Sequence, residues 1–161
     1  MIGLSEVEIE RLIACPKAIA EPPKAEMTLK NRSYRNDMKV VNLASQERFT
    51  VFLRKSEEFE EDFSVGLLFH SAEGRQYMIY RCNGPHGETT EDFQVGETHY
   101  GYHEHFIVPY TNEMIPSMTT GYGSFHDAVA YFLKKCNVQG AGQYFKFLKA
   151  NDQLTFDLGK E

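Results

Sequence analysis

Hydrophobic residues recur at every second position through the middle of the chain, over 37–44, 47–55 and 62–70. The alternating positions are Met38, Val40, Phe49, Val51, Leu53, Phe63, Val65, Leu67 and Phe69. Turns are predicted at 44–46, between the first two runs, and at 71–74, after the third. This alternation is typical of half-buried antiparallel strands joined by turns, so it predicts a meander of three strands.

A fourth run, 75–82, continues the pattern up to the Gly-Pro turn at Gly84. Strict alternation here predicts Tyr77, Ile79 and Arg81 on one face and Met78, Tyr80 and Cys82 on the other. Further strands are predicted at 98–108 and at 154–156.

Two segments have helical spacing instead. Ser5 and Glu8 have the spacing of a capping box, and the apolar stripe behind them stops at Pro16, which predicts a helix of about ten residues. The second helix begins after Ser124 as N-cap and runs to about residue 136. Lysines in its last turn suit the negative end of the helix dipole.

These elements predict an α+β fold with a mainly antiparallel sheet of about five to six strands, flanked by an N-terminal and a C-terminal helix. The length of 161 residues and the hydrophobic content of 42% are enough for one core. We therefore expect residues 1–161 to form a single α+β domain.

Charge and cysteine content narrow the function classes. A net charge of −6 opposes non-specific binding to DNA, because such binding needs a basic surface, and leaves nucleic acid only as a ligand held at a local site. Cys15, Cys82 and Cys136 show neither a disulfide framework nor a Cys-x-x-Cys zinc motif. With no apolar segment long enough for a membrane span, we predict a cytoplasmic protein without membrane association.

Four of the six histidines lie within twenty positions, at His86, His99, His103 and His105. In an extended strand His103 and His105 project to the same face, because residues two apart share a face. His86 lies in the Gly-Pro turn that precedes this strand. If the strands on either side of the turn are neighbours, the His86 imidazole meets the other two.

Two chemistries suit these residues. His86, His103 and His105 are a workable ligand set for zinc or another divalent metal, with one coordination position left for water. The same imidazoles suit an acid and base pair for RNA transphosphorylation, with Arg81 holding a phosphate. The candidate catalytic residues are therefore His86, His103, His105 and Arg81, and the candidate metal ligands are the same three histidines.

A structural or solvated role competes with both chemistries. Histidine pairs on half-exposed strands are often solvated, and Glu104 then serves only solubility. Gly101 separates His99 from the pair, which weakens its claim. For His70 and His126 a structural role is expected, and Tyr102 is assigned to the other side of the strand, as core or partner surface.

The second function hypothesis is a non-catalytic partner-binding protein, such as an inhibitor from a mobile genetic element, acting through an acidic, tyrosine-rich surface. The acidic run from Glu57 to Asp62 is predicted to be a solvated hairpin, with phosphate mimicry as the alternative. The sequence thus leaves two candidate partners, an RNA substrate and another protein.

The chain resembles a poorly characterised bacterial and phage-associated family through four short segments. These are Leu4–Ile13 with Pro16 and Lys17, Arg81-Cys-Asn-Gly-Pro-His86, Tyr102-His-Glu-His105, and Phe132-Leu-Lys-Lys-Cys-Asn137. They match a capped N-terminal helix, an Arg-x-x-Gly-x-His turn, a Thr-His-x-His strand and a Phe-Leu-x-x-Cys-Asn helix end, although Tyr102 replaces the threonine and His99 is additional. The resemblance implies a small bacterial or phage-related cytoplasmic protein and no established activity.

Overall fold

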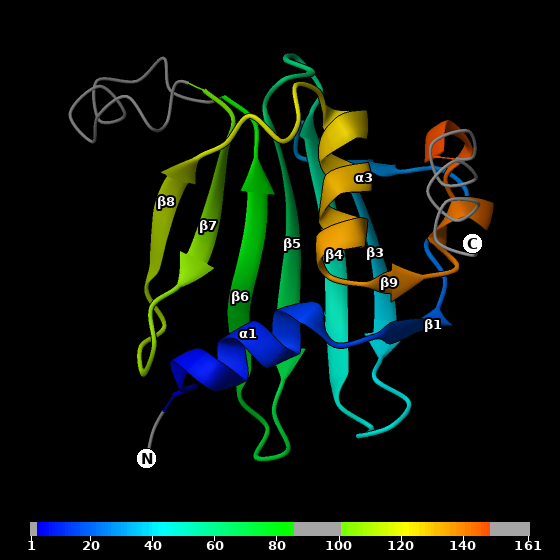
Figure 1. Ribbon diagram of the computed structural model, residues 1–161. Helices are drawn as coiled ribbons and strands as arrows, with labels where there is room; N and C mark the ends of the chain where they lie inside the picture. The colour runs from blue at the N-terminus through cyan, green and yellow to red at the C-terminus, as the bar shows by residue number, and fades with distance from the viewer. Residues whose placement is uncertain (1–2, 86–100, 149–161) are drawn as a thin grey trace, which may run out of the picture.

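The computed structural model describes residues 3–85 and 101–148. Its α-helices lie on one large sheet (Figure 1). The helices are α1 (Glu6–Ala14) and α3 (Phe125–Lys135), followed by short 3-10 helices at Ala141–Gln143 and Lys146–Leu148. The strands are β1 (Lys17–Glu21), β2 (Thr28–Lys30), β3 (Ser33–Val41), β4 (Arg48–Ser56), β5 (Phe63–His70), β6 (Gln76–Asn83), β7 (His103–Ile107), β8 (Met114–Met118) and β9 (Val138–Gln139). The predicted strand at 154–156 lies outside the described residues.

The nine strands form one curled sheet in the order β8-β7-β6-β5-β4-β3-β1-β9, with β2 paired to β3. The α+β class and the mainly antiparallel sheet are confirmed, and the described pairs are antiparallel except β1 with β9. The predicted number of five to six strands is wrong. Most of the additional strands are short, and β8 contains Pro116, which weakens the strand pattern and is tolerated because β8 lies at the sheet edge.

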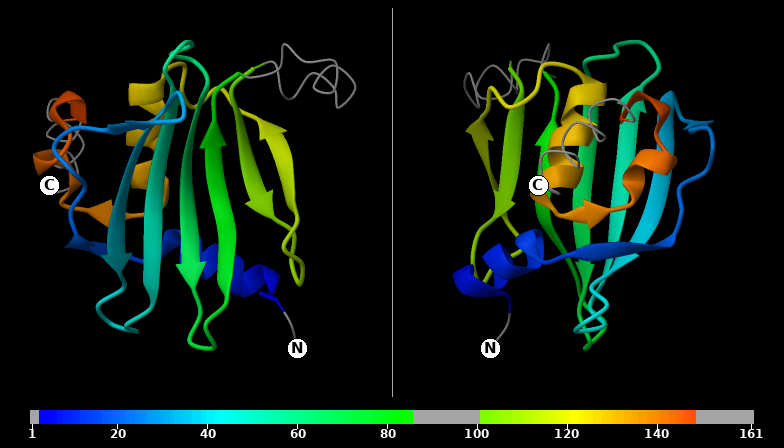
Figure 2. Two further views of the ribbon diagram at one scale, coloured as in Figure 1. Left: turned by 180° about the vertical axis from the view of Figure 1, so that it is seen from behind. Right: turned by 45° about the vertical axis from the view of Figure 1, so that its right-hand side comes forward.

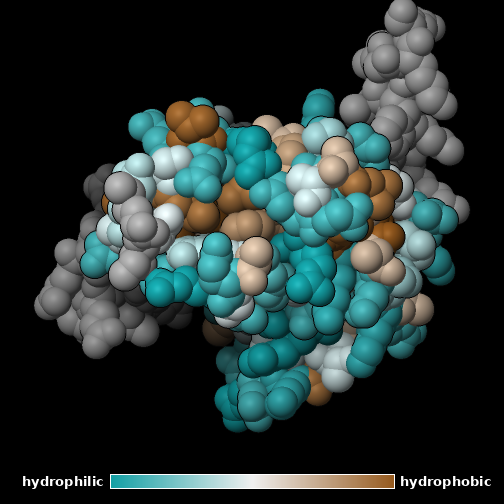
Figure 3. All heavy atoms as spheres, turned by 90° about the horizontal axis from the view of Figure 1, so that it is seen from below, coloured by the Kyte–Doolittle hydropathy of each residue, from teal (hydrophilic) through white to brown (hydrophobic). Residues whose placement is uncertain are grey.

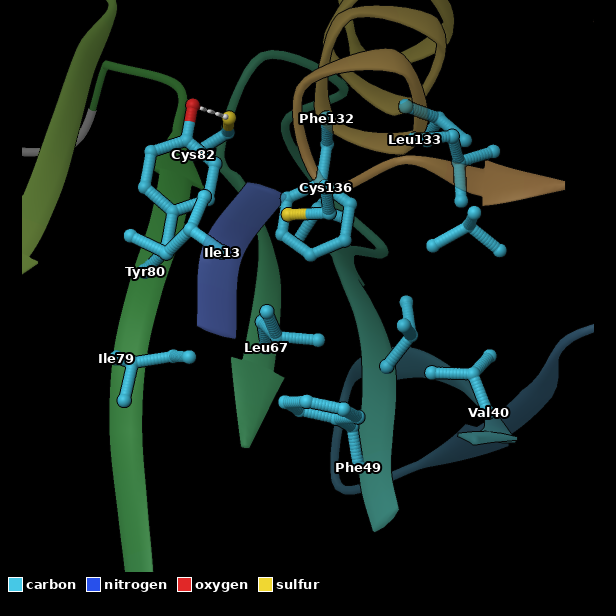
Figure 4. Packing of buried hydrophobic residues seen from close by; sticks show 14 of the residues in the cluster. Ile13, Val40, Phe49, Leu67, Ile79, Tyr80, Cys82, Phe132, Leu133 and Cys136 are labelled. Carbon is cyan, nitrogen blue, oxygen red and sulfur yellow. Dashed lines mark hydrogen bonds between the residues drawn. The ribbon is translucent and has the colours of Figure 1, made fainter. Parts of the chain in front are cut away.

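Both helices lie on the same face of the sheet, and Figure 2 shows the opposite face from behind without a helix across it. The core fills the space between the helices and the sheet. Figure 4 shows Phe132 of α3 close to residues of the central strands, among them Leu67. Within residues 3–85 and 101–148, neither helix has the length and apolar content of a membrane-spanning segment.

Both helix starts follow the sequence prediction. The Ser5 hydroxyl accepts from the Glu8 amide at 3.1 Å and the Glu8 carboxylate accepts from the Ser5 amide at 3.1 Å, so the capping box is confirmed. The Ser124 hydroxyl accepts from the Asp127 amide at 3.1 Å. Capping fixes where each helix begins, and the apolar stripe that follows turns toward the core.

Lys17 joins the ends of the two helices. Its side chain is 1% exposed, and its ammonium donates to the carbonyls of Ile13 at 2.8 Å, Cys15 at 2.9 Å and Cys136 at 2.7 Å. These carbonyls lie at the C-terminal ends of α1 and α3, where backbone oxygens lack helical partners and carry partial negative charge. One buried cation therefore satisfies both helix ends.

Strand β6 departs from the predicted alternation. The pairing of β5 with β6 shifts between Leu67 and Leu68, where Leu67 faces Tyr80 and Leu68 faces Met78, which leaves Ile79 as an extra residue. Such a β-bulge turns two consecutive side chains to one face. Ile79 and Tyr80 are both fully buried on the helix side, so the predicted face assignment of Arg81 with Ile79 is wrong.

All three thiols are buried within the core, and we expect them to react slowly in the native protein. Burial raises the pKa of Cys82 to about 12 and also raises that of Cys136. Because the thiolate is the reactive species, modification by Ellman's reagent should be about a hundredfold slower in the native protein than in guanidinium chloride. Rapid labelling of Cys82 in the native protein would contradict this burial.

Candidate functional site

The residues singled out by the sequence meet on β6 and β7. These strands are antiparallel neighbours, with Arg81 opposite His105 and Asn83 opposite His103. Directly opposite residues share a face of the sheet, so all four side chains lie on the face away from the helices. His86 and His99 lie outside the described residues, so the predicted approach of His86 to the pair stays a prediction.

Asn83 links the arginine to one of the histidines. Its Oδ1 accepts from Arg81 Nε at 2.9 Å and lies 3.0 Å from His105 Nδ1. Because Arg Nε can only donate, this amide atom is an acceptor, and His105 Nδ1 must carry the proton. In the neutral imidazole the lone pair of His105 is therefore on Nε2.

His103 has the same tautomer. Its Nδ1 lies 3.0 Å from the carbonyl oxygen of Gly101, which can only accept a hydrogen bond. The two imidazoles are adjacent, with ring centroids 4.9 Å apart and planes at 70°. A histidine whose Nδ1 donates to a fixed acceptor is the usual form in metal sites and in proton transfer, where Nε2 is the reactive nitrogen.

The pair is enclosed. His103 is 0% and His105 6% exposed, so the solvated alternative for these histidines is wrong, whereas the structural alternative remains. Arg81 is half-buried, and burial lowers the pKa of its guanidinium. His70 and His126 lie apart from this pair. The Nε2 of His70 is 2.7 Å from the Thr50 hydroxyl, and His126 stacks on the ring of Phe147.

Glu104 lies between the two histidines in sequence but points to the other face of β7. It is 7% exposed, accepts a short hydrogen bond from the Tyr80 hydroxyl, and pairs with Lys135 Nζ at 2.9 Å. The expectation that Glu104 serves only solubility is wrong. Strand alternation indicated its face, but nothing in the sequence pattern linked it to Lys135, which is 31 residues away.

Aromatic rings enclose this ion pair. Lys135 Nζ lies 5.2 Å from the ring centroid of Tyr80, 5.0 Å from that of Phe106 and 5.5 Å from that of Tyr131. Such positions allow cation–π attraction in addition to the ion pair. Burial, and then the neighbouring Cys82 thiol, raises the pKa of Tyr80, so Tyr80 keeps the proton that it donates. Figure 4 shows the contact between the Tyr80 hydroxyl and the Cys82 sulfur.

Tyr122 fixes β6 and β7 beside the histidines. Its hydroxyl lies 2.9 Å from the carbonyl oxygen of Asn83 and 2.7 Å from that of His103, and these two oxygens share its single donated proton. Tyr102 packs nearby, with its ring 5.8 Å from Tyr122 and 6.2 Å from Phe63, which agrees with the expected core side of the strand. Sequence reasoning missed both Tyr122 and Asn83. The signal for Asn83 was its position two residues after Arg81, because residues two apart on a strand share a face.

The described residues do not complete a metal site. Among residues 3–85 and 101–148, no three His, Cys, Asp or Glu side chains converge with ligand geometry. The Nδ1-protonated imidazoles of His103 and His105 have the chemistry of zinc ligands, but a third protein ligand must come from elsewhere, as predicted for His86. Two imidazoles are sufficient for acid–base chemistry.

Comparisons with protein-family models, with curated proteins and with solved structures find no match to this chain. The family resemblance given by its short motifs therefore stays a prediction, and the function must be argued from the geometry of the site.

Proposed function

We propose that this protein is a small RNA-cleaving enzyme, in which His103 and His105 exchange protons with the substrate and Arg81 holds the scissile phosphate. One observation carries the proposal: Asn83 bonds both Arg81 and His105, so an anion-binding group and an oriented imidazole share one face. Within the described residues, Arg81 forms no ion pair. A histidine pair with a purely structural role would not need such an unneutralised arginine beside it.

The reaction follows from these groups. One imidazole removes the proton of the ribose 2′-hydroxyl, and the 2′-oxygen then attacks the neighbouring phosphorus. The bond to the 5′-oxygen breaks as the second imidazole, in its protonated form, donates a proton to that leaving oxygen. The products are a 2′,3′-cyclic phosphate and a free 5′-hydroxyl. Arg81 stabilises the charge that develops on the non-bridging oxygens.

We favour metal-free chemistry because it needs only the two described imidazoles. A zinc-dependent mechanism needs His86 as a further ligand, and we keep His86 as a proposed third member of either site. A cytoplasmic location fits the three cysteines, none of which forms a disulfide.

The second candidate, a partner-binding inhibitor, is favoured by one observation at the sheet edge. β8 is an edge strand, and its Ile115 and Met118 are 58% and 51% exposed. Exposed edge strands bind partners by strand addition.

Seen from the end of the molecule where the β5–β6 turn lies, the surface is mainly hydrophilic with small separate hydrophobic patches, so that end offers no large apolar interface (Figure 3).

We expect His105→Ala to lower the rate of RNA cleavage by about a hundredfold, because it removes one of the two proton-transfer groups. The assay follows a fluorescein-labelled single-stranded RNA in the presence of EDTA across pH 5 to 9. The wild type should give a bell-shaped pH profile and a 2′,3′-cyclic phosphate end.

His126→Ala is the matched control, because His126 is exposed on α3 and stacks on Phe147 at 3.9 Å, away from the pair. It should cleave at the wild-type rate. Absence of cleavage by the wild type, or cleavage that persists unchanged in His105→Ala, would overturn the proposed function.

A further inference from the structure

The helix-free face continues from the histidines across three more strands in two rows of directly opposite residues. The first row runs His103, Asn83, Ser64, Arg54 and Arg35 from β7 to β3. The second row runs His105, Arg81, Gly66, Phe52 and Asp37. The two rows therefore place the buried histidine pair and these arginines on the same face of the sheet.

This face is basic although the chain is acidic. On β3 to β6 it carries five cationic side chains and a single carboxylate, which belongs to Asp37. The cationic residues are Arg35, Lys39, Arg48, Arg54 and Arg81. Asp37 pairs with Arg54 at 2.8 Å, and Lys39 lies 3.9 Å from Glu21 of β1. Cationic side chains therefore outnumber carboxylates on these four strands of this face, although the chain as a whole has a net charge of −6.

Arg35 and Arg54 lie directly opposite each other on neighbouring strands. Like charges in this position repel each other, and Arg54 is offset by its ion pair with Asp37, whereas Arg35 pairs with no described carboxylate. The Nε of Arg35 is buried and has no hydrogen-bond partner among the described residues. No described carboxylate lies within ion-pair distance of Arg35 or Arg81. These donors suit an anionic ligand that supplies the missing acceptors.

Phe52 is a half-buried aromatic residue in the second row, two positions before Arg54 on β4. Its ring lies against Gly66 of β5, where a Cβ would come within 2.2 Å of the ring, so only glycine allows this position. The guanidinium carbon of Arg54 is 5.1 Å from the ring centroid. An aromatic ring beside arginines is the usual platform for single-stranded nucleic acid, in which bases stack and phosphates bind cations.

We infer that this face binds single-stranded RNA, with a base stacked on Phe52 and phosphates held by Arg35, Arg54 and Arg81. The inference rests on the proposed function in one respect: the bound RNA is taken to run along this face toward His103 and His105. Single strands fit better than duplexes, because an A-form duplex keeps its bases stacked internally and cannot offer one to Phe52.

The test measures binding separately from cleavage. The probe is a fluorescein-labelled single-stranded 2′-O-methyl RNA, which lacks the nucleophilic 2′-hydroxyl and stays intact. Fluorescence anisotropy over a salt series should show at least about tenfold weaker binding for the double variant R35Q/R54Q. Its slope of log affinity against log salt should fall by about 1.4, at about 0.7 for each phosphate contact.

Phe52→Leu separates stacking from charge. It should weaken binding about tenfold and leave the salt slope unchanged, because one base loses its aromatic platform and no cation is removed. R35K/R54K, which keeps both charges, should retain the salt slope. Arg32→Gln is the control, since Arg32 is exposed in the β2–β3 turn and pairs with Glu58 at 3.2 Å.

Wild-type affinity in R35Q/R54Q, or tighter binding of duplex RNA or of a polyglutamate peptide than of the single strand, would overturn the inference. The two proposals fail separately. Binding of the uncleavable probe without cleavage of RNA supports this surface and removes the proposed enzyme. Cleavage of RNA with unchanged probe binding in R35Q/R54Q removes this surface and leaves the enzyme.

Discussion

Replacing Lys17 by methionine is expected to lower the free energy of unfolding by about 4 kcal/mol. Methionine fills nearly the same volume but cannot donate a hydrogen bond. Three buried carbonyls, from Ile13, Cys15 and Cys136, would then lose the ammonium that satisfies them. Each buried polar group left without a partner costs about 1–3 kcal/mol, and here the loss also exposes the negative ends of two helix dipoles to the core.

Urea denaturation followed by circular dichroism measures this loss as a lower transition midpoint. Lys39→Met is the matched control, because the Lys39 side chain is 62% exposed. Its ion pair with Glu21, at the long distance of 3.9 Å, contributes less than about 1 kcal/mol to the free energy of unfolding. If Lys17→Met and Lys39→Met unfold at the same urea concentration, Lys17 does not hold the two helix ends together.

The second large effect is expected at the buried ion pair behind the histidines. Glu104→Ala should destabilise the fold by about 3–5 kcal/mol, because it leaves the Lys135 ammonium without its carboxylate and the Tyr80 hydroxyl without its oxygen acceptor. Glu104→Gln keeps an acceptor for Tyr80 and removes only the charge, so its loss should be smaller.

The same unfolding measurement distinguishes these variants. Glu113→Ala, a substitution of an exposed carboxylate just before β8, should leave stability within about 0.5 kcal/mol of the wild type. Equal stability of Glu104→Ala and Glu113→Ala would show that the pair with Lys135 contributes nothing.

The two faces of β7 therefore have different tasks. The side chain of Glu104 faces the helices and ties the strand to α3, whereas those of His103 and His105 face away. Tyr122 bonds the backbone of both β6 and β7 from the helix side, which holds Asn83 and His103 in register. Rigid positioning of this kind is what proton transfer requires, since small displacements of a catalytic group are costly.

Interactions between neighbouring residues allowed the sequence to predict many of the helices and strands. The Ser5–Glu8 capping box, the Ser124 cap and the alternation on β3, β4 and β5 depend on neighbours within a few residues, and the structure has each of them. The pairing of His103 and His105 on one face also follows from the period of two along a strand. Strands β2 and β9 are too short to show a period, and β1 and β8 carry apolar residues at consecutive positions, so these four strands were missed.

By itself, then, the sequence determined the α+β class, the helix caps and the shared face of the two histidines, because each is a property of neighbouring residues. Only the tertiary structure decided which distant groups meet. The bulge at Ile79 placed Arg81 on the face opposite to the predicted one. Lys17 donates a hydrogen bond to the C-terminal end of α3, and Glu104 forms an ion pair with Lys135. Net charge is a sum over the whole chain and does not show where charges lie. Strand register placed Arg35, Arg54 and Arg81 on one face, because pairing across a sheet joins residues far apart in sequence.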